Sequence, residues 1–345
     1  MDEKFNVLVV DDASFMTKAI SEILESDPDV TVVGVARNGQ EGLEQIKRFR
    51  PDVITLDIDM PVMNGIEAIR HIMIESPVPI VVLSSLFGDG SITFEALRLG
   101  VVDFVAKPSG AISKDIHVAK QQILDRIKLA TSVNLENVRR VRVIKQDVRE
   151  TLAARYGFQP LEYLVAMGTS LSGPNTFIRL MTQLSPAMPA AAVVVLEINS
   201  QILPAFVQKF NDFVPWKVEV ACQNTVIEQG VCYIHSNETA LTIQPNDSGE
   251  PAFNIAGPVE RPLDTFFSSV AEVFKQQAIG IMLTGYGDDG ADGFAAIQQK
   301  SGVTIAQSIE TCVYPNLTDN AIKCQTVDQI VEESHLAEAI ENIIS

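Results

Sequence analysis

Residues 53–65 read VITLDIDMPVMNG, and this stretch decides the fold of the first part of the chain. Its first four residues are apolar or β-branched and predict a short buried strand that ends at Asp57. A turn with Pro, Asn and Gly follows, and a helical pattern resumes over residues 65–73. A buried strand that leads directly into a helix is typical of a parallel sheet.

The same alternation of strand and helix extends in both directions from this stretch. Further strands are expected at residues 5–10, 30–36, 80–83 and 104–106, and further helices after Asp12 and at residues 41–48. Near-continuous apolar strands separated by helices imply a parallel sheet covered on both faces. The sequence therefore predicts a five-stranded, doubly wound α/β domain.

Polar side chains collect where these expected strands end. Asp11 and Asp12 follow the first strand, Asp57 the third, Ser84 the fourth and Lys107 the fifth. We expect them to share one pocket, because ligands bind beyond the carboxyl ends of parallel strands. Three converging carboxylates repel one another and need a cation, and carboxylate oxygens suit Mg²⁺. With Lys107 as a second positive charge, the pocket is suited to an acyl phosphate.

These residues carry a resemblance over residues 5–125. The matches are Asp11-Asp12, the run Thr55–Pro61 with Asn64-Gly65, Ser84-Ser85 and Phe104–Pro108. On them the sequence resembles the response-regulator receiver family. The resemblance implies that Asp57 takes a phosphoryl group from a chemotaxis-type histidine kinase.

The resemblance also assigns roles to the neighbours of Asp57. It implies that Asp12 and Asp57 bind Mg²⁺ together with the Asp59 carbonyl, while Asp11 acts on the metal through water. Ser84 is implied to hydrogen-bond the phosphoryl group, and Phe104 to change rotamer in a switch that includes Lys107. Such a switch is a local change of charge that biases a bistable surface.

A second apolar pattern begins after Gly157. Strands are expected at residues 164–167, 191–196, 218–221, 231–234, 280–283 and 303–306, the last being the final strand expected. They predict a second, mostly parallel α/β domain. We therefore divide the chain into a receiver domain over residues 1–125, a linker over 126–158 and a second domain over 159–345.

Two polar loops of this second domain follow expected strands. Residues 168–174 read GTSLSGP and lead into a helix, so Ser170 lies beside helix-start amides that stabilise an oxyanion. Residues 284–290 read TGYGDDG and place an acid at a neighbouring strand end. A serine and an acid at two such ends favour an enzyme, although the first loop is also compatible with ordinary turn chemistry.

Over residues 162–345 the sequence resembles the catalytic domain of CheB-type chemotaxis methylesterases. The matches are Met167–Ser170, Pro258, Arg261-Pro262, Asp264, Leu283–Gly285, Gly287, Asp289-Gly290, Ala306-Gln307 and Thr311–Val313. The resemblance implies a serine hydrolase of methylated glutamates in methyl-accepting chemoreceptors, sometimes also deamidating glutamines, that its unphosphorylated receiver inhibits. Ser170 matches the nucleophile and Asp289 the orienting acid.

The base of that family does not carry over, because Glu197 stands at the histidine position. A carboxylate normally titrates near pH 4, well below the range in which imidazole takes a proton. His71 in a receiver helix, His117 near the connector and His335 in the C-terminal helix offer no replacement, and His235 alone is expected near a suitable loop.

Two further departures affect the same region. Leu171-Ser172 replace a usual Thr-Gly pair, and Asn316-Leu317-Thr318 replace Gly-Met-Pro. Together with Glu197 they predict that esterase activity is lost or impaired.

Two functional hypotheses remain open, and Glu197 favours the first. In the first, a non-catalytic regulator docks on a chemoreceptor or kinase under control of Asp57. In the second, a phosphorylation-gated methylesterase and glutamine deamidase works with an altered base. A phosphate sink that drains a kinase needs only the receiver and is a third possibility.

Charge and composition limit which classes of partner the protein binds and where in the cell we expect it. A formal charge of −18 argues against nucleic acid, and no apolar run approaches the length of a membrane span. The N-terminal residues lack a secretory signal, so we expect a cytoplasmic protein without membrane insertion. Four cysteines without CxxC spacing predict reduced, mostly structural thiols and no zinc site.

Overall fold

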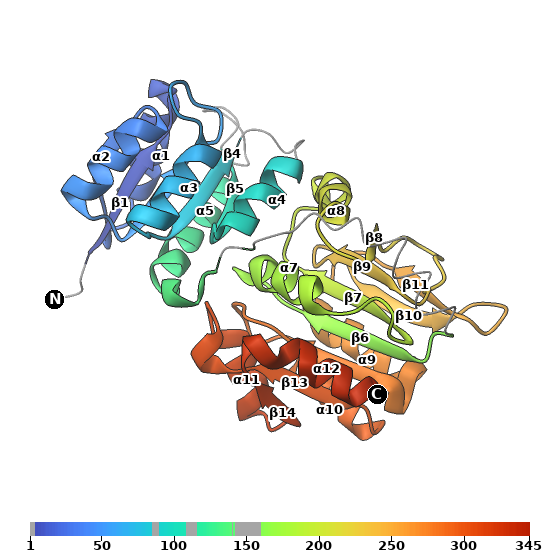
Figure 1. Ribbon diagram of the computed structural model, residues 1–345. Helices are drawn as coiled ribbons and strands as arrows, with labels where there is room; N and C mark the ends of the chain where they lie inside the picture. Colours follow the sequence, from blue (N-terminus) through green and yellow to red (C-terminus); the bar gives the residue numbers. More distant parts are fainter. Residues whose placement is uncertain (1–3, 85–89, 108–115, 140, 142–159) are drawn as a thin grey trace. The chain divides into compact units, whose positions relative to one another are not determined.

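The chain folds into two compact units, Met1–Arg140 and Val141–Ser345 (Figure 1). The computed structural model describes residues 4–84, 90–107, 116–139, 141 and 160–345. Residue 140 and residues 142–158 of the predicted linker lie outside the described residues. The preceding helix continues six residues beyond the expected boundary at residue 125, as far as Thr131.

The first unit is built on a five-stranded parallel sheet in the order β2-β1-β3-β4-β5. Its strands are β1 Phe5–Val10, β2 Val30–Ala36, β3 Val53–Leu56, β4 Ile80–Ser84 and β5 Asp103–Ala106. Its helices are α1 Ser14–Leu24, α2 Gly39–Phe49, α3 Gly65–Glu75, α4 Gly90–Leu99 and α5 Ile116–Thr131, followed by the 3₁₀ turn η1 Leu135–Asn137. Helices α1 and α5 contact each other, as do α2, α3 and α4 in succession. The predicted doubly wound fold is confirmed.

Local sequence fixes where two of these helices begin. The Asn38 side chain accepts a hydrogen bond from the Glu41 amide at the start of α2, and Asn64 does the same for Glu67 in α3. Such caps satisfy amides that have no partner within the helix. Because Asn64 caps α3 directly after the β3 turn, the helix starts beside Asp57.

The second unit contains a seven-stranded sheet in the order β14-β13-β12-β6-β7-β9-β8, in which every strand pair is parallel. Its strands are β6 Tyr163–Gly168, β7 Ala190–Leu196, β8 Lys217–Val220, β9 Val231–Ser236, β12 Ala278–Met282, β13 Val303–Gln307 and β14 Gln329–Val331. A separate antiparallel hairpin consists of β10 Leu241–Pro245 and β11 Pro251–Ile255. The mostly parallel fold predicted for this unit is confirmed.

Six helices connect the described strands of this unit or follow them. They are α7 Gly173–Gln183, α8 Leu203–Asn211, α9 Pro262–Phe274, α10 Ala291–Gln299, α11 Asn316–Lys323 and α12 Leu336–Ile344, with 3₁₀ turns η2 Lys275–Gln277, η3 Ile309–Thr311 and η4 Glu333–His335. Helices α9 and α10 pack together, and the rings of Phe267 and Phe294 meet edge to face with centroids 5.0 Å apart.

Three sequence expectations for this unit were wrong. Residues 303–306 do not form the last strand, because the short edge strand β14 follows; with only three residues it gives little periodic signal. His235 lies inside β9 and is buried, rather than in a loop after that strand. His335 belongs to η4, just before α12, and not to the helix itself.

Strand order places both candidate sites. In the first unit the chain leaves β1 for β2 on one side and returns to β3 on the other. In the second it leaves β6 for β7 on one side and returns to β12 on the other. Each of these two places is a topological switch point, where loops diverge and leave a crevice. Asp57 lies at the first switch point and Ser170 at the second.

Gly65 is required for close packing against the chain that follows β3. A Cβ at this position would lie 2.3 Å from the Asp57 carbonyl oxygen and 2.7 Å from the Ile58 Cα, both in the backbone. We expect Gly65→Ala to lower the free energy of unfolding of the first unit by about 1–3 kcal/mol. Denaturant titration of the full chain, followed by a probe in this unit, measures it.

The matched control is Gly42→Ala in α2. A Cβ there would meet Val10 at 3.5 Å, an ordinary contact. Because glycine is a poor helix former, this change is expected to be neutral or to stabilise by up to about 1 kcal/mol. Equal destabilisation by both variants would contradict the packing argument.

Candidate functional site

The first candidate site gathers the acids predicted at the ends of β1 and β3. Carboxylate oxygens of Asp11, Asp12 and Asp57 lie within 4.8 Å of one another. The Lys107 ammonium is 2.7 Å from Asp11 Oδ2 and 2.7 Å from Asp57 Oδ2. The backbone holds the two strand ends together, since the Asp57 amide donates to the Val10 carbonyl. The pocket therefore brings four of the predicted residues together.

Burial and the ammonium group oppose each other in this pocket. Burial raises the pKa of Asp57, and its contacts with Lys107 only partly offset this effect. Burial lowers the pKa of Lys107, but its bonds to Asp11 and Asp57 outweigh that effect and leave the pKa above its ordinary value. Lys107 therefore stays charged, and the three acids form a compact set of hard oxygen donors, as Mg²⁺ requires.

The other predicted receiver residues surround this cluster. Ser84 ends β4, and its carbonyl accepts the Lys107 amide at 3.0 Å. Phe104 lies in β5, half-buried against the core of this unit. The Asp59 side chain is exposed, in the turn after β3.

The second candidate site starts at the turn after β6. Ser170 is buried, and its hydroxyl donates to the Tyr286 carbonyl at 2.7 Å. The hydroxyl of the preceding Thr169 donates to the Thr284 carbonyl at 2.6 Å. A Cβ on Gly285 would lie 2.6 Å from Ser170 Oγ, so only glycine permits this approach. Ser170 therefore lies directly against loop 284–290, the loop after β12.

The strained residue of this turn is Ser172 and not Ser170. The residue with left-handed backbone is Ser172, with φ of 62°, at the N-cap of α7. A serine here takes a conformation that glycine adopts without strain. Ser172 occupies a position where the sequence departs from the usual glycine, so the departure coincides with a strained residue.

Loop 284–290 is anchored to three neighbouring segments. The Gly285 amide donates to the Tyr314 carbonyl at 2.9 Å, and the Gly287 amide donates to Asn316 Oδ1 at 2.8 Å. Asn320 Nδ2 donates to the Asp288 carbonyl at 2.8 Å, as does Arg261 at 2.9 Å. The loop is thus fixed by hydrogen bonds to its backbone.

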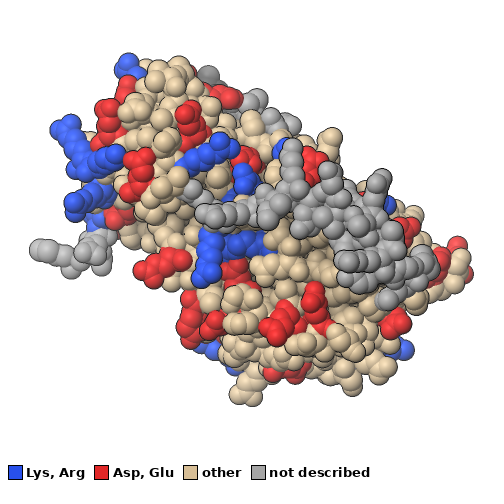
Figure 2. Space-filling view, viewed as in Figure 1, with Lys and Arg blue, Asp and Glu red and all other residues tan. Residues whose placement is uncertain are grey.

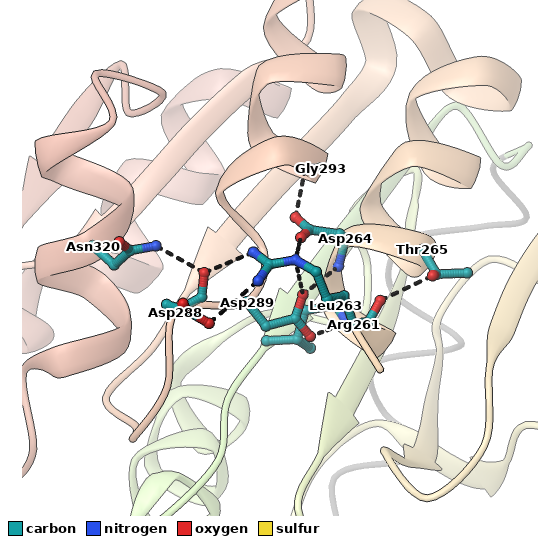
Figure 3. A network of polar contacts seen from close by, with 8 residues as sticks. All are labelled: Arg261, Leu263, Asp264, Thr265, Asp288, Asp289, Gly293 and Asn320. Atoms are coloured by element: carbon teal, nitrogen blue, oxygen red, sulfur yellow. Dashed lines mark hydrogen bonds and ion pairs between the residues drawn. The ribbon is translucent and has the colours of Figure 1, made fainter. Parts of the chain in front are cut away.

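Asp289 bonds to the first turn of α9 (Figure 3). Its Oδ2 accepts the Leu263 amide at 2.7 Å, and its Oδ1 accepts the Asp264 amide at 3.0 Å. Burial raises the pKa of Asp289 to about 6, and the nearby Asp264 carboxylate adds to this rise, while the two amides oppose it. Both oxygens of the predicted orienting acid are therefore occupied by backbone donors.

The histidines of the described residues bond elsewhere. His235 Nε2 lies 3.0 Å from the Thr239 hydroxyl and 3.2 Å from its carbonyl, and burial lowers the pKa of His235. His71 pairs with Glu75 in α3, and His335 lies 3.9 Å from Glu332. The His117 side chain lies outside the described residues.

Glu197 follows β7, whose end is held to the Ser170 turn by a hydrogen bond from the Thr169 amide to the Val195 carbonyl. Glu197 is half-buried at this strand end. The fold therefore brings Ser170, Glu197 and Asp289 to three adjacent strand ends, β6, β7 and β12.

Two family profiles match this chain. A receiver profile described as the response regulator receiver domain covers residues 7–117, and a profile described as CheB methylesterase covers residues 165–340. The chain belongs to the CheB methylesterase family. It has the domain composition of a chemotaxis response regulator methylesterase.

Relatives of this family match along nearly the whole chain. A protein-glutamate methylesterase/protein-glutamine glutaminase of Symbiobacterium thermophilum is 34% identical over 97% of this chain and 95% of its own. One of Geobacillus kaustophilus is 35% identical over 98% of each. The Thermotoga maritima CheB methylesterase catalytic domain, 23% identical, shares the fold of the second unit, with a TM-score of 0.50 over 53% of this chain and 98% of that domain.

Sequence reasoning missed the residues that hold loop 284–290. Arg261 and Asp264 stand among the family matches without an assigned role, although an acid in the first turn of a helix that begins with proline is a recognisable start signal. The sequence marked Asn316 only as part of a departure from Gly-Met-Pro, and it marked Asn320 not at all. Their role as anchors was missed because their partners are backbone groups about thirty residues away. In the part of the chain that the structure describes, no helix could span a bilayer.

The four cysteines differ in exposure to solvent. Cys222 and Cys324 are exposed, whereas Cys232 and Cys312 are buried. Burial raises the pKa of the Cys312 thiol to about 11 and also raises that of Cys232. The buried pair therefore stays protonated and unreactive, as expected of structural thiols.

The phosphoacceptor can be tested with a small-molecule donor. Acetyl phosphate with Mg²⁺ should label the wild-type chain, and Asp57→Ala should take up no label, because the nucleophilic carboxylate is gone. Intact-mass spectrometry measures the added phosphoryl group. Asp59→Asn is the control and should still be labelled, because its side chain is exposed and its carbonyl remains. Equal labelling of wild type and Asp57→Ala would refute the assignment.

Asp289 should give a pH-dependent contribution to stability. Its pKa is about 6 in the folded chain against an ordinary value of 3.8, so between these values the folded state holds a proton that the unfolded state has released. The contribution is therefore largest below pH 4 and is lost as pH rises through 6.

Comparison of wild type with Asp289→Asn isolates this effect. The Tm of wild type should fall relative to that of Asp289→Asn between pH 4.5 and 7, as measured by calorimetry of the second unit's transition. Asp288→Asn removes an exposed neighbouring carboxylate, and its Tm should show the same pH dependence as that of wild type. A constant difference between wild type and Asp289→Asn across this range would show that Asp289 titrates normally.

Proposed function

We propose that this protein is a response regulator phosphorylated on Asp57 by a chemotaxis-type histidine kinase, with a CheB-like unit that acts by docking rather than by ester hydrolysis. Its partners are methyl-accepting chemoreceptors or the kinase itself. The observation that carries the second half of the proposal is Glu197, which stands where the family has its histidine, while the Ser170 hydroxyl donates to the Tyr286 carbonyl instead of to a side-chain base. A backbone carbonyl cannot take a proton from a serine.

The receiver chemistry follows from the contacts of Asp57. A carboxylate oxygen of Asp57 attacks the phosphorus of the donor's phosphohistidine, the P–N bond breaks and the imidazole leaves. Lys107, 2.7 Å from Asp57, is placed to balance charge on the phosphoryl oxygens, and Ser84 lies at the end of the neighbouring strand. Asp11, Asp12 and Asp57, with the Asp59 carbonyl, would hold Mg²⁺, which offsets negative charge on the phosphoryl group.

In this scheme Phe104 and Lys107 report phosphorylation to the surface. Before transfer, Lys107 bridges Asp11 and Asp57. Addition of a dianionic group to Asp57 increases the negative charge beside Lys107 and gives the Ser84 hydroxyl an anion to bond. Under this proposal Phe104, half-buried on β5 against the core, changes rotamer in response.

Glu197 is a poor substitute for the family histidine. A carboxylate takes up a proton from a serine hydroxyl far less readily than imidazole does at neutral pH. A second anion at this edge of the sheet also opposes the negative charge that develops on the oxyanion. In the serine protease subtilisin, loss of the triad base costs about 10⁶ in turnover. His235 does not compensate, because Thr239 occupies its Nε2.

A second candidate function is an active, phosphorylation-gated protein-glutamate methylesterase and glutamine deamidase. Two observations favour it. Ser170 and Asp289 follow adjacent strands at a switch point, and the full-length relatives carry the methylesterase/glutaminase name. In this case Glu197 or a residue outside the described ones is the base.

The surface supports protein partners rather than polyanions. Figure 2 shows acidic and basic side chains interspersed over the visible face, and the formal charge of the chain is −18. The net negative charge disfavours nucleic acid as a partner. Under this proposal the protein works in the cytoplasm, because that is where it meets the kinase and the cytoplasmic parts of the chemoreceptors.

Methanol release decides between the two functions. Protein carrying a beryllofluoride phosphoryl mimic should release little or no methanol from methylated receptors, and Ser170→Ala should be no lower. Sedimentation of the same protein with receptor-containing membranes should nevertheless show binding that depends on Asp57. Robust methanol release abolished by Ser170→Ala would replace the docking function with the hydrolytic one.

Glu197→His tests the missing base directly. This variant should gain Ser170-dependent methanol release if the positions of Ser170 and Asp289 remain productive. Recovery is limited by geometry, because positioning errors near 1 Å cost about 10²-fold. Glu197→Gln is the matched control: it removes the charge without supplying a base and should stay inactive.

A further inference from the structure

Helices α9 and α10 cap each other at their N-terminal ends. Asp289, just before α10, accepts the amides of Leu263 and Asp264 in the first turn of α9. In return, Asp264 Oδ1 accepts the Gly293 amide in the first turn of α10 at 2.8 Å. Each helix thus supplies the carboxylate that satisfies the other's unpaired amides. We call these two carboxylates the acid pair (Figure 3).

Charge explains why two acids tolerate each other here. Both helix N-terminal ends carry positive partial charge, and they converge on the acid pair. Arg261 adds a full positive charge: its Nε lies 2.5 Å from Asp264 Oδ2 and 3.9 Å from Asp289 Oδ1. The other charged neighbour in the loop is Asp288, whose exposed carboxylate lies 3.3 Å from Arg261; Asp292 in the first turn of α10 is also exposed.

Close helix packing depends on the same site. A Cβ on Gly293 would lie 2.6 Å from Phe267 Cβ and 3.1 Å from the Asp264 Cα, so glycine lets α10 approach α9. Asp289 follows loop residues 284–288 directly in the chain. The reciprocal cap therefore fixes the C-terminal end of the loop whose Tyr286 carbonyl accepts the Ser170 hydroxyl.

We propose that Asp264, Asp289 and Arg261 are positioning residues that hold loop 284–290 against the Ser170 turn by capping α9 and α10 reciprocally. The effect reaches Ser170 through two bonds, from Thr169 Oγ1 to the Thr284 carbonyl and from Ser170 Oγ to the Tyr286 carbonyl. Asp289 then has a structural reason to be present in a chain that lacks the family histidine.

This role is separate from the proposed function, because it holds whether or not the chain hydrolyses esters. It also gives Asp289 a role that needs no catalysis. The presence of an acid in the loop that contacts Ser170 is not by itself a sign of a working triad, since both carboxylate oxygens of Asp289 are engaged by α9.

Hydrogen exchange followed by mass spectrometry tests the proposal in the full-length protein. Asp264→Asn should speed exchange of peptides covering residues 284–290 and 169–173 by about tenfold or more, because a charged acceptor is lost. Peptides from β7 and β9 should keep wild-type exchange. Asp288→Asn, which removes an exposed carboxylate of the same loop, is the control and should stay within about twofold of wild type. Arg261→Gln, at a half-exposed position, provides a second and milder variant that should act on the same two peptides.

A pH profile separates positioning by the acid pair from a general structural effect. Because Asp289 has a raised pKa only while the loop is closed, opening of residues 284–290, corrected for intrinsic exchange, should increase from pH 5 to pH 7.5 in wild type, by about tenfold. Burial is the main cause of the raised pKa, so Asp264→Asn, which removes only the like charge, should reduce this dependence without abolishing it. The proposal is overturned if both variants leave residues 284–290 and 169–173 at wild-type exchange, or if exchange rises equally throughout the second unit.

Discussion

Both units depend on one constraint: carboxylates gathered beyond the ends of parallel strands need positive charge beside them. In the first unit a single ammonium group, that of Lys107, lies 2.7 Å from both Asp11 and Asp57. In the second, Arg261 and two helix N-terminal ends balance Asp264 and Asp289. Without such partners, like charges in a partly buried crevice would raise the free energy of the fold by several kcal/mol.

The two crevices use this constraint differently. In the receiver, the acids remain an open set of oxygen donors balanced by a side-chain ammonium group, so the charge balance is free to change when Asp57 is modified. In the CheB-like unit, the oxygens of Asp289 are taken by backbone amides that do not move independently of α9. The first arrangement suits a switch, and the second suits a rigid support for the Ser170 turn.

Glu197 replaces the family histidine, but this replacement does not remove the contacts that hold the Ser170 turn. Ser170 is buried and its hydroxyl is held by the Tyr286 carbonyl, so the fold keeps this serine in place without a histidine beside it. The position of the Ser170 turn therefore depends on the packing around loop 284–290 and not on the residue at position 197.

The sequence by itself determined the two α/β folds and the acids of the receiver pocket. Strand periodicity and the βα order fix which residues stand at strand ends, and parallel strands bring those ends to one edge. The departure at Glu197 was equally visible in the sequence. By contrast, the edge strand β14 and the burial of His235 inside β9 were missed, because a three-residue strand and a strand boundary carry little periodic signal.

Only the tertiary structure decided what Asp289 bonds to. Its partners, the amides of Leu263 and Asp264, lie about 25 residues earlier in the chain and are identical in kind to every other backbone amide. No residue pattern marks such a partner, because the packing of α9 against α10 creates the contact. The sequence therefore specified which chemical groups are present, and the packing of the helices specified which of them are already engaged.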